Sequence, residues 1–120
     1  MKIIVKIRLD AATNEILPVE DEHTCFNKRR RVMVTTAHVN DQVVFVPADP
    51  THQLAVFFTC ARSPVGESKE PTVEQGKSLT VNGPAGRYRY SCVLSTASGL
   101  RTWPALRGGG GEVDIPKGRS

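Results

Sequence analysis

The stretch that decides the fold is Arg87-Tyr88-Arg89-Tyr90-Ser91-Cys92-Val93-Leu94. Its side chains alternate, so that one face carries Tyr88, Tyr90, Cys92 and Leu94 and the other carries Arg87, Arg89, Ser91 and Val93. Successive side chains of a β-strand point to opposite faces of its sheet. A period of two therefore predicts a strand over residues 87–94 with one face in the core.

Seven further segments carry strand signals on either side of this one. They are residues 2–9, 15–19, 31–36, 42–46, 53–60, 77–81 and 112–115. Pro18 has no backbone N–H to donate, so the second of these is expected at a sheet edge. No long amphipathic helix is indicated. The sequence predicts about eight strands in an all-β fold, a Greek-key β-sandwich or barrel that residues 1–120 form as a single domain.

Three connecting segments give weaker signals. Residues 20–31 place acidic side chains before basic ones, which fits either one or two helical turns or an irregular, charge-paired loop. Residues 61–76 are rich in Pro, Gly, Ser and Glu and predict a surface loop. A long polar loop follows residue 94, and it ends in the run Gly108–Gly111. Since neither a helix nor a Lys-Ser/Thr pair follows, we interpret this run as a flexible connector and not as a phosphate-binding loop.

The composition indicates a globular chain with a small basic excess. The 120 residues are 39% hydrophobic and carry a formal net charge of +4, which fits neither a disordered nor a membrane protein. The three cysteines exclude a fully paired disulfide framework and leave open one pair or three free thiols. Charges interrupt the first apolar stretch, so it does not resemble a signal peptide. We expect a cytoplasmic protein if Met1 is the native start, and a periplasmic one if a signal peptide has been removed ahead of it.

Three stretches in the middle of the chain follow one another in a suggestive order. They are Val39-Asn40-Asp41-Gln42-Val43-Val44-Phe45-Val46, Asp49-Pro50-Thr51-His52-Gln53-Leu54 and Gly86-Arg87-Tyr88-Arg89-Tyr90-Ser91-Cys92. Together they resemble the turn and strand, the loop histidine and the G-x-Y-x-Y-x-C strand of the cupredoxin family of blue-copper proteins. The resemblance covers just under half of the chain and implies a cupredoxin-like arrangement of the strands.

The resemblance also implies a copper-ligand set, which this sequence completes only in part. His52 matches the first copper histidine and Cys92 matches the copper thiolate. The family places a second histidine, and usually a methionine, shortly after the cysteine, but residues 93–107 contain neither. Only His23 or His38 is left to supply the imidazole that a His₂Cys site needs. We therefore expect a cupredoxin-like domain without a functional copper site and without another cofactor.

Other conspicuous residues are interpreted one by one. Cys92 is expected to be a small buried core residue, and Cys25 the exposed thiol. Trp103 is either an exposed aromatic that contacts a partner, with Arg101 and Arg107 beside it, or a lid packed over one end of the barrel.

The basic run Lys28-Arg29-Arg30-Arg31 has two interpretations. Four positive charges in a row can bind phosphates. The preceding residues Glu20, Asp21 and Glu22 can instead neutralise the run. A nucleic-acid-binding protein usually shows a larger basic excess together with stacking aromatic residues. The sequence therefore favours a solvated run over a nucleic-acid site.

No arrangement of residues indicates catalysis, because paired acids, a Ser/His/Asp set and a dinucleotide loop are all missing from the sequence. We expect a non-enzymatic binding or structural module that docks a protein partner through the loops at one end of the barrel. One alternative is copper binding or electron transfer through His52 and Cys92. The other is weak nucleic-acid binding through residues 28–31. No membrane partner is expected.

Overall fold

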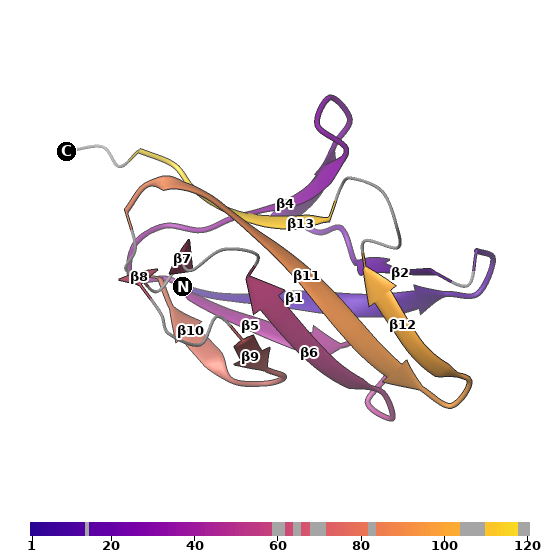
Figure 1. Ribbon diagram of the computed structural model, residues 1–120. Coiled ribbons are helices and arrows are strands. Elements are labelled where there is room, and N and C mark those ends of the chain that lie inside the picture. Colours follow the sequence, from indigo (N-terminus) through magenta and orange to yellow (C-terminus); the bar gives the residue numbers. More distant parts are fainter. Residues whose placement is uncertain are drawn as a thin grey trace.

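The computed structural model of the chain describes residues 1–13, 15–58, 62–63, 66–67, 72–81, 84–103 and 110–117. These residues form strands and no helix, which confirms the predicted all-β class (Figure 1). The strands are β1 (Lys2–Asp10), β2 (Glu15–Pro18), β3 (Thr24–Asn27), β4 (Val32–Thr36), β5 (Gln42–Pro47), β6 (Gln53–Phe58), β7 (Arg62–Ser63), β8 (Gly66–Glu67), β9 (Thr72–Glu74), β10 (Ser78–Thr80), β11 (Gly86–Thr96), β12 (Gly99–Trp103) and β13 (Gly111–Ile115). Within the described residues, no helix is long and apolar enough to cross a lipid bilayer.

The first sheet has four strands in the order β10-β5-β1-β2. Strand β1 runs parallel to β5, with Val5 opposite Phe45, and antiparallel to β2, with Arg8 opposite Leu17. Strand β2 lies at the edge of this sheet, as the proline at its end predicts. The outer face of β1 is exposed and carries Lys2, Ile4, Lys6 and Arg8.

The second sheet is built around β11. Its order is β3-β4-β13-β11-β6-β9, and β12 also pairs with β11. The first half of β11 pairs with β13, from Gly86 to Tyr90, and the second half pairs with β12, from Cys92 to Thr96. Strands β13 and β12 therefore follow one another along one edge of β11, while β6 occupies the other edge. The two sheets lie face to face (Figure 1).

The inner faces of the two sheets share one hydrophobic core. It contains the alternating side chains of β1 and β5 from the first sheet and those of β6, β11 and β13 from the second. All four residues that the sequence assigned to the buried face of β11 are buried: Tyr88, Tyr90, Cys92 and Leu94. Full burial of a leucine such as Leu94 stabilises the fold by about 1.5–3 kcal/mol. A slip of one residue would move all four side chains to the solvent face, so these positions set the register of the sheet.

Tyr90 occupies the centre of this core. Its ring contacts Phe45 and Phe58 edge-on, at centroid distances of 5.0 and 6.0 Å. It also lies over the backbone of Gly111, its partner on β13. A Cβ atom at Gly111 would stand 2.1 Å from Cζ of Tyr90, so only glycine leaves room for the ring.

The structure corrects several sequence-based expectations. The described residues form thirteen strands where about eight were expected. Residues 20–31 contain strand β3 and a hairpin turn, so neither a helix nor an irregular loop describes them. The segment after residue 94 includes β12, which forms a hairpin with β11. Strands β7, β8 and β9 also interrupt the expected loop over residues 61–76. The glycine run is not a flexible connector throughout, because Gly111 begins β13 and the carbonyl of Gly110 accepts a hydrogen bond from Met33 N. Gly108 and Gly109 lie outside the described residues.

Candidate functional site

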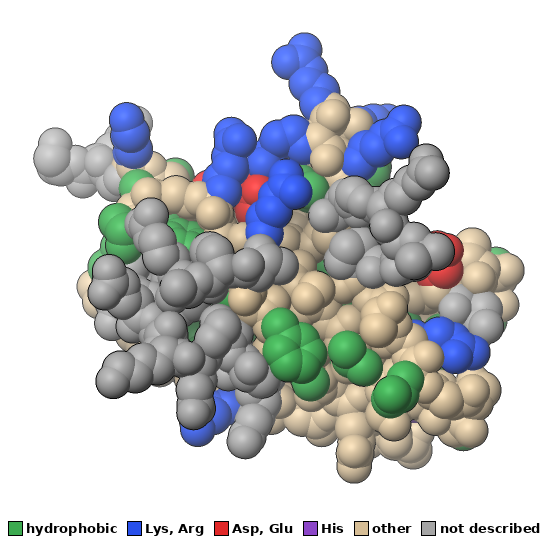
Figure 2. Space-filling view, in the orientation of Figure 1, with side chains coloured by type: hydrophobic (Ala, Val, Ile, Leu, Met, Phe, Trp, Pro, Cys, Tyr) green, Lys and Arg blue, Asp and Glu red, His purple; other side chains and the backbone are tan. Residues whose placement is uncertain are grey.

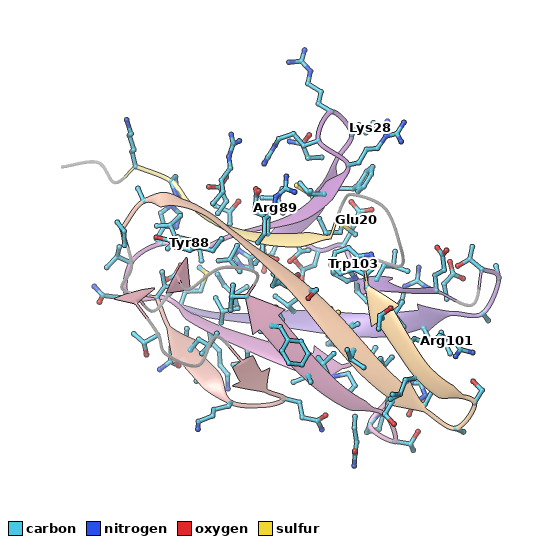
Figure 3. The ribbon with its side chains drawn as sticks, viewed as in Figure 1. Glu20, Lys28, Tyr88, Arg89, Arg101 and Trp103 are labelled. Atoms are coloured by element: carbon cyan, nitrogen blue, oxygen red, sulfur yellow. The ribbon has the colours of Figure 1, made fainter. Side chains whose placement is uncertain are left out.

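Two distant segments bring basic side chains to the outside of the second sheet. Residues 28–31 form the turn of the β3–β4 hairpin, and Arg87 and Arg89 lie on the outer face of β11. We call these six residues, Lys28, Arg29, Arg30, Arg31, Arg87 and Arg89, the basic face. Figure 2 shows Lys and Arg side chains gathered along this part of the surface, and Figure 3 shows Lys28 at the tip of the hairpin.

The register explains why these segments meet. Arg89 lies opposite Glu112 and Arg87 opposite Asp114 on β13, and β13 in turn runs parallel to β4, the second strand of the hairpin. Side chains directly opposite each other on one face of an antiparallel pair are about 4.5–5.5 Å apart at their Cβ atoms. Arg30 of the turn donates to the carboxylate of Glu112 on this face, so the turn projects from the same side of the sheet as the two arginines of β11.

Arg30 and Glu112 form the central ion pair of this surface. Nη1 of Arg30 donates to Oε1 of Glu112 at 2.8 Å, and Nη2 donates to Oε2 at 2.9 Å. The Glu112 side chain is only 1% exposed, whereas that of Arg30 is 26% exposed. The hydrogen bond to Glu112 raises the pKa of the Arg30 guanidinium. Nε of Arg89 stands 4.0 Å from the same carboxylate, so Glu112 lies between two arginines.

This pairing corrects the expectation that Glu20, Asp21 and Glu22 neutralise the basic run. A carboxylate oxygen of Glu20 accepts a hydrogen bond from the backbone N–H of Phe26, and Asp21 accepts from the backbone of Thr24. Glu22 stands 3.6 Å from the imidazole of His23. Each of these acidic side chains contacts a group of its own segment. The carboxylate that pairs with Arg30 lies 82 residues away in the chain.

The described side chains leave the basic face strongly positive. Its six basic residues are accompanied by two carboxylates on the same face of β13, Glu112 and Asp114. The excess of four positive charges equals the formal net charge of the whole chain. Lys28, Arg29 and Arg31 are all exposed, and Arg31 adopts a positive φ of 53° that completes the turn.

His52 and Cys92, the two residues of the alternative copper-binding interpretation, lie apart along β6 and β11. Cys92 lies opposite Val56 on β6, and His52 comes four residues before Val56. The part of this interval that belongs to β6, Gln53 to Val56, alone spans about 10 Å at about 3.3 Å per residue. Nε2 of His52 stands 3.6 Å from Asp49 instead. Among the described residues, no three His, Cys, Asp or Glu side chains form a group that could hold a metal.

Trp103 lies on β12 opposite Cys92, and not in the long loop where the sequence placed it. Its side chain is partly buried against the core, 6.1 Å from the ring of Tyr90. Of the two interpretations of this residue, packing over the core describes it better than an exposed contact. Arg101 is half-buried on the same strand, and Arg107 lies outside the described residues.

The cysteines differ as the sequence predicts where the structure describes them. Cys92 is buried, and burial raises the pKa of its thiol to about 12, so it stays protonated. Cys25 is exposed on β3. Cys60 lies outside the described residues.

Phe57 is a surface residue that the sequence analysis did not single out. Its side chain is 37% exposed on the outer face of β6, opposite Ser91 of β11. The alternation of β6, in which Leu54, Val56 and Phe58 are buried, already implied that Phe57 faces outward. An outward phenylalanine on a central strand was the signal available in the sequence.

Comparison with protein-family models finds no match, and no curated protein or solved structure matches the chain significantly. The cupredoxin resemblance therefore stays a prediction from the sequence.

Proposed function

We propose that this chain is a non-enzymatic β-sandwich module that binds a polyanionic partner through the basic face. The observation that carries the proposal is the convergence of two segments, residues 28–31 and the outer face of β11, where six basic side chains accompany the two outward carboxylates of β13. Such a surface attracts anions over a distance set by the ionic strength.

The Arg30–Glu112 pair supports a preorganised surface. Two parallel hydrogen bonds fix the guanidinium against a buried carboxylate, and thereby tie the hairpin turn to β13. Paired arginines lose little further freedom when a ligand arrives. Lys28, Arg29 and Arg31 extend from the same turn and are exposed to solvent. The turn thus offers three cations on a backbone that is already held in place.

The basic face is favoured over docking through Trp103. The partial burial of Trp103 against the core leaves less of its ring for a partner than an exposed loop position would. Arg101 is also half-buried. The wide separation of His52 and Cys92 gives the copper alternative no comparable support.

The experiment compares two triple variants of the full chain that remove the same charge from different sheets. The first carries Lys28→Gln, Arg29→Gln and Arg31→Gln. The matched control carries Lys2→Gln, Lys6→Gln and Arg8→Gln on the exposed face of β1. Arg30 is left unchanged in both, because its loss would leave a buried carboxylate unpaired. Binding of a fluorescein-labelled heparin fragment is measured by anisotropy at about 0.1 M salt, where charges more than about 10 Å apart are largely screened from each other.

We expect the first variant to bind about tenfold or more weakly than wild type, since each lost phosphate- or sulfate-type contact removes a released counterion. The control should bind within about twofold of wild type, because its charges lie on the other sheet. An equal loss in both variants would show that binding follows net charge alone, and the proposal would then be wrong.

A further inference from the structure

An exposed aromatic ring lies beside the basic face. Phe57 on β6 is opposite Ser91 on β11, and Arg89 comes two residues before Ser91 on the same outer face. Diagonal neighbours of this kind are about 7–8 Å apart, within reach of long side chains. Ser91 is short, so on the β11 side no long side chain stands directly opposite the ring. Figure 2 shows hydrophobic side chains exposed below the cluster of Lys and Arg.

We infer that the basic face and Phe57 together bind single-stranded nucleic acid, with a base stacked on the Phe57 ring and the phosphates at the arginines. This inference rests on the proposed function and specifies its partner. The combination of a cationic track with an exposed aromatic ring is what sequence-tolerant single-strand binding requires. A base in a duplex already stacks on its neighbours, so an open ring on a sheet face selects unpaired strands.

Nucleic-acid binding usually needs more basic side chains than the run itself provides, together with an aromatic residue on which a base can stack. The neighbouring strands supply both. The run itself holds no aromatic residue, and two of its neighbours in space come from β11, more than 50 residues later in the chain. Arg87 and Arg89 widen the positive surface, and Phe57 provides the stacking platform. An acidic protein would be attracted by the same charges, but it would gain nothing specific from the exposed ring.

The remaining outer surface of these strands is compatible with a strand of nucleotides. Beyond Ser91, the outward positions of β11 are Val93 and Ser95, and Ala55 lies opposite Val93 on β6. These side chains are small, and none of them is acidic. A chain that leaves Phe57 along β11 therefore meets short side chains without negative charge on β11 and β6, whereas Glu74 lies opposite Ala55 on the next strand, β9.

The test uses the full chain and two labelled oligomers of about ten residues, a length within the range of single-strand sites. One is oligo-dT, and the other is an abasic sugar–phosphate oligomer of equal length. The variants are Phe57→Ala and Phe57→Tyr. Phe26→Ala serves as the matched control, because Phe26 is 46% exposed but lies on β3, with its side chain on the opposite side of the sheet by alternation. Thermal unfolding of each variant verifies that it is folded.

We expect oligo-dT to bind about tenfold more tightly than the abasic oligomer. Phe57→Ala should remove this difference without changing abasic binding, Phe57→Tyr should retain it, and Phe26→Ala should bind like wild type. Equal binding of the two oligomers, or a Phe57→Ala variant that still prefers oligo-dT, would overturn the inference and leave the proposed function standing. Failure of both oligomers and of heparin to bind would overturn both. Equally tight binding of poly-glutamate would identify an acidic protein as the partner class and also overturn the inference.

Discussion

Arg30 and Glu112 are 82 residues apart in the sequence, yet the guanidinium of one holds the buried carboxylate of the other through two hydrogen bonds of 2.8 and 2.9 Å. The pair joins the β3–β4 turn to β13, two parts of the second sheet that no local signal connects. A carboxylate placed inside a sheet is costly unless its charge is compensated. The pair therefore governs both the shape of the basic face and the stability of the sheet beneath it.

Removal of Arg30 alone should destabilise the protein more than removal of both partners. In Arg30→Met the cation that remains near the Glu112 carboxylate, among the described residues, is the more distant Arg89, whose Nε stands 4.0 Å away. Arg30→Lys should lie between that variant and wild type, because an ammonium does not form the paired, planar contact. The double variant Arg30→Met with Glu112→Leu should recover most of the lost stability. Urea unfolding midpoints rank the four proteins.

Gly111→Ala should destabilise the fold by about 3 kcal/mol, at the upper end of what overpacking usually costs. The added Cβ would stand 2.1 Å from Cζ of Tyr90, which is itself wedged between Phe45 and Phe58. Gly76→Ala is the comparison, since nothing lies within 4 Å of its Cβ position and only its φ of 75° is unfavourable. That variant should lose about 1–2 kcal/mol. Denaturant unfolding measures both, and equal losses would show that the Tyr90 ring moves aside easily.

The strands that are easiest to predict from the sequence are those whose own residues alternate between hydrophobic and polar. In β1 and β11 a buried and an exposed side chain alternate, so a period of two is visible in the residues themselves. Strand β12 has no fully buried residue, and β3 has only Thr24. Both lie in hairpins whose partners, β11 and β4, carry the hydrophobic pattern. Such strands form because a neighbour offers hydrogen bonds, which local sequence does not record.

The candidate site also combines a part that is visible in the local sequence with a part that depends on strand pairing. The run from Lys28 to Arg31 is plain in the sequence, but its pairing with Glu112 and its meeting with Arg87 depend on which strands become neighbours. The parallel β4–β13 pairing creates both, and a non-local pairing of this kind cannot be derived from charge order along the chain. Phe57 was within reach of the sequence, since strand alternation alone places it outward.

The two described free cysteines should differ sharply in reactivity. Cys25 is exposed, whereas Cys92 is buried with a pKa raised to about 12 by its removal from solvent. Because the thiolate is the reactive form, iodoacetamide at pH 8 should modify Cys25 in the native protein and leave Cys92 untouched. Peptide mass spectrometry locates the label, and unfolding in urea should expose Cys92. Labelling of native Cys92 at the rate of Cys25 would place β11 in the wrong register.

The variant Cys92→Ala should lower the free energy of unfolding by about 1–3 kcal/mol, through lost contacts and a small void.

The last prediction concerns alkaline pH, where Cys92 and Tyr90 act together. Burial raises the pKa of both groups. No described group meets hydrogen-bonding geometry at the Tyr90 hydroxyl. The nearby Thr35 side chain lowers the pKa of Tyr90 and offsets part of the increase. In the unfolded chain the thiol and the phenol lose their protons at their usual pKa values of about 8.5 and 10. The folded protein keeps both protons there. Above about pH 9 the native state therefore binds more protons than the unfolded state, and the free energy of unfolding must fall as the pH rises.

Each retained proton contributes a slope of about 1.4 kcal/mol per pH unit, so the loss should steepen when the phenol joins the thiol. For Cys92 the loss extends up to its folded pKa of about 12. Tyr90→Phe should keep the stability at pH 7 within about 1 kcal/mol, because no described group meets hydrogen-bonding geometry at the hydroxyl it removes, and should flatten the curve above pH 10. Cys92→Ala should flatten it between pH 9 and 10. Urea unfolding at a series of pH values from 7 to 11 gives the slopes. An unchanged slope in both variants would mean that other groups titrate and that these two side chains are not the buried acids of the core.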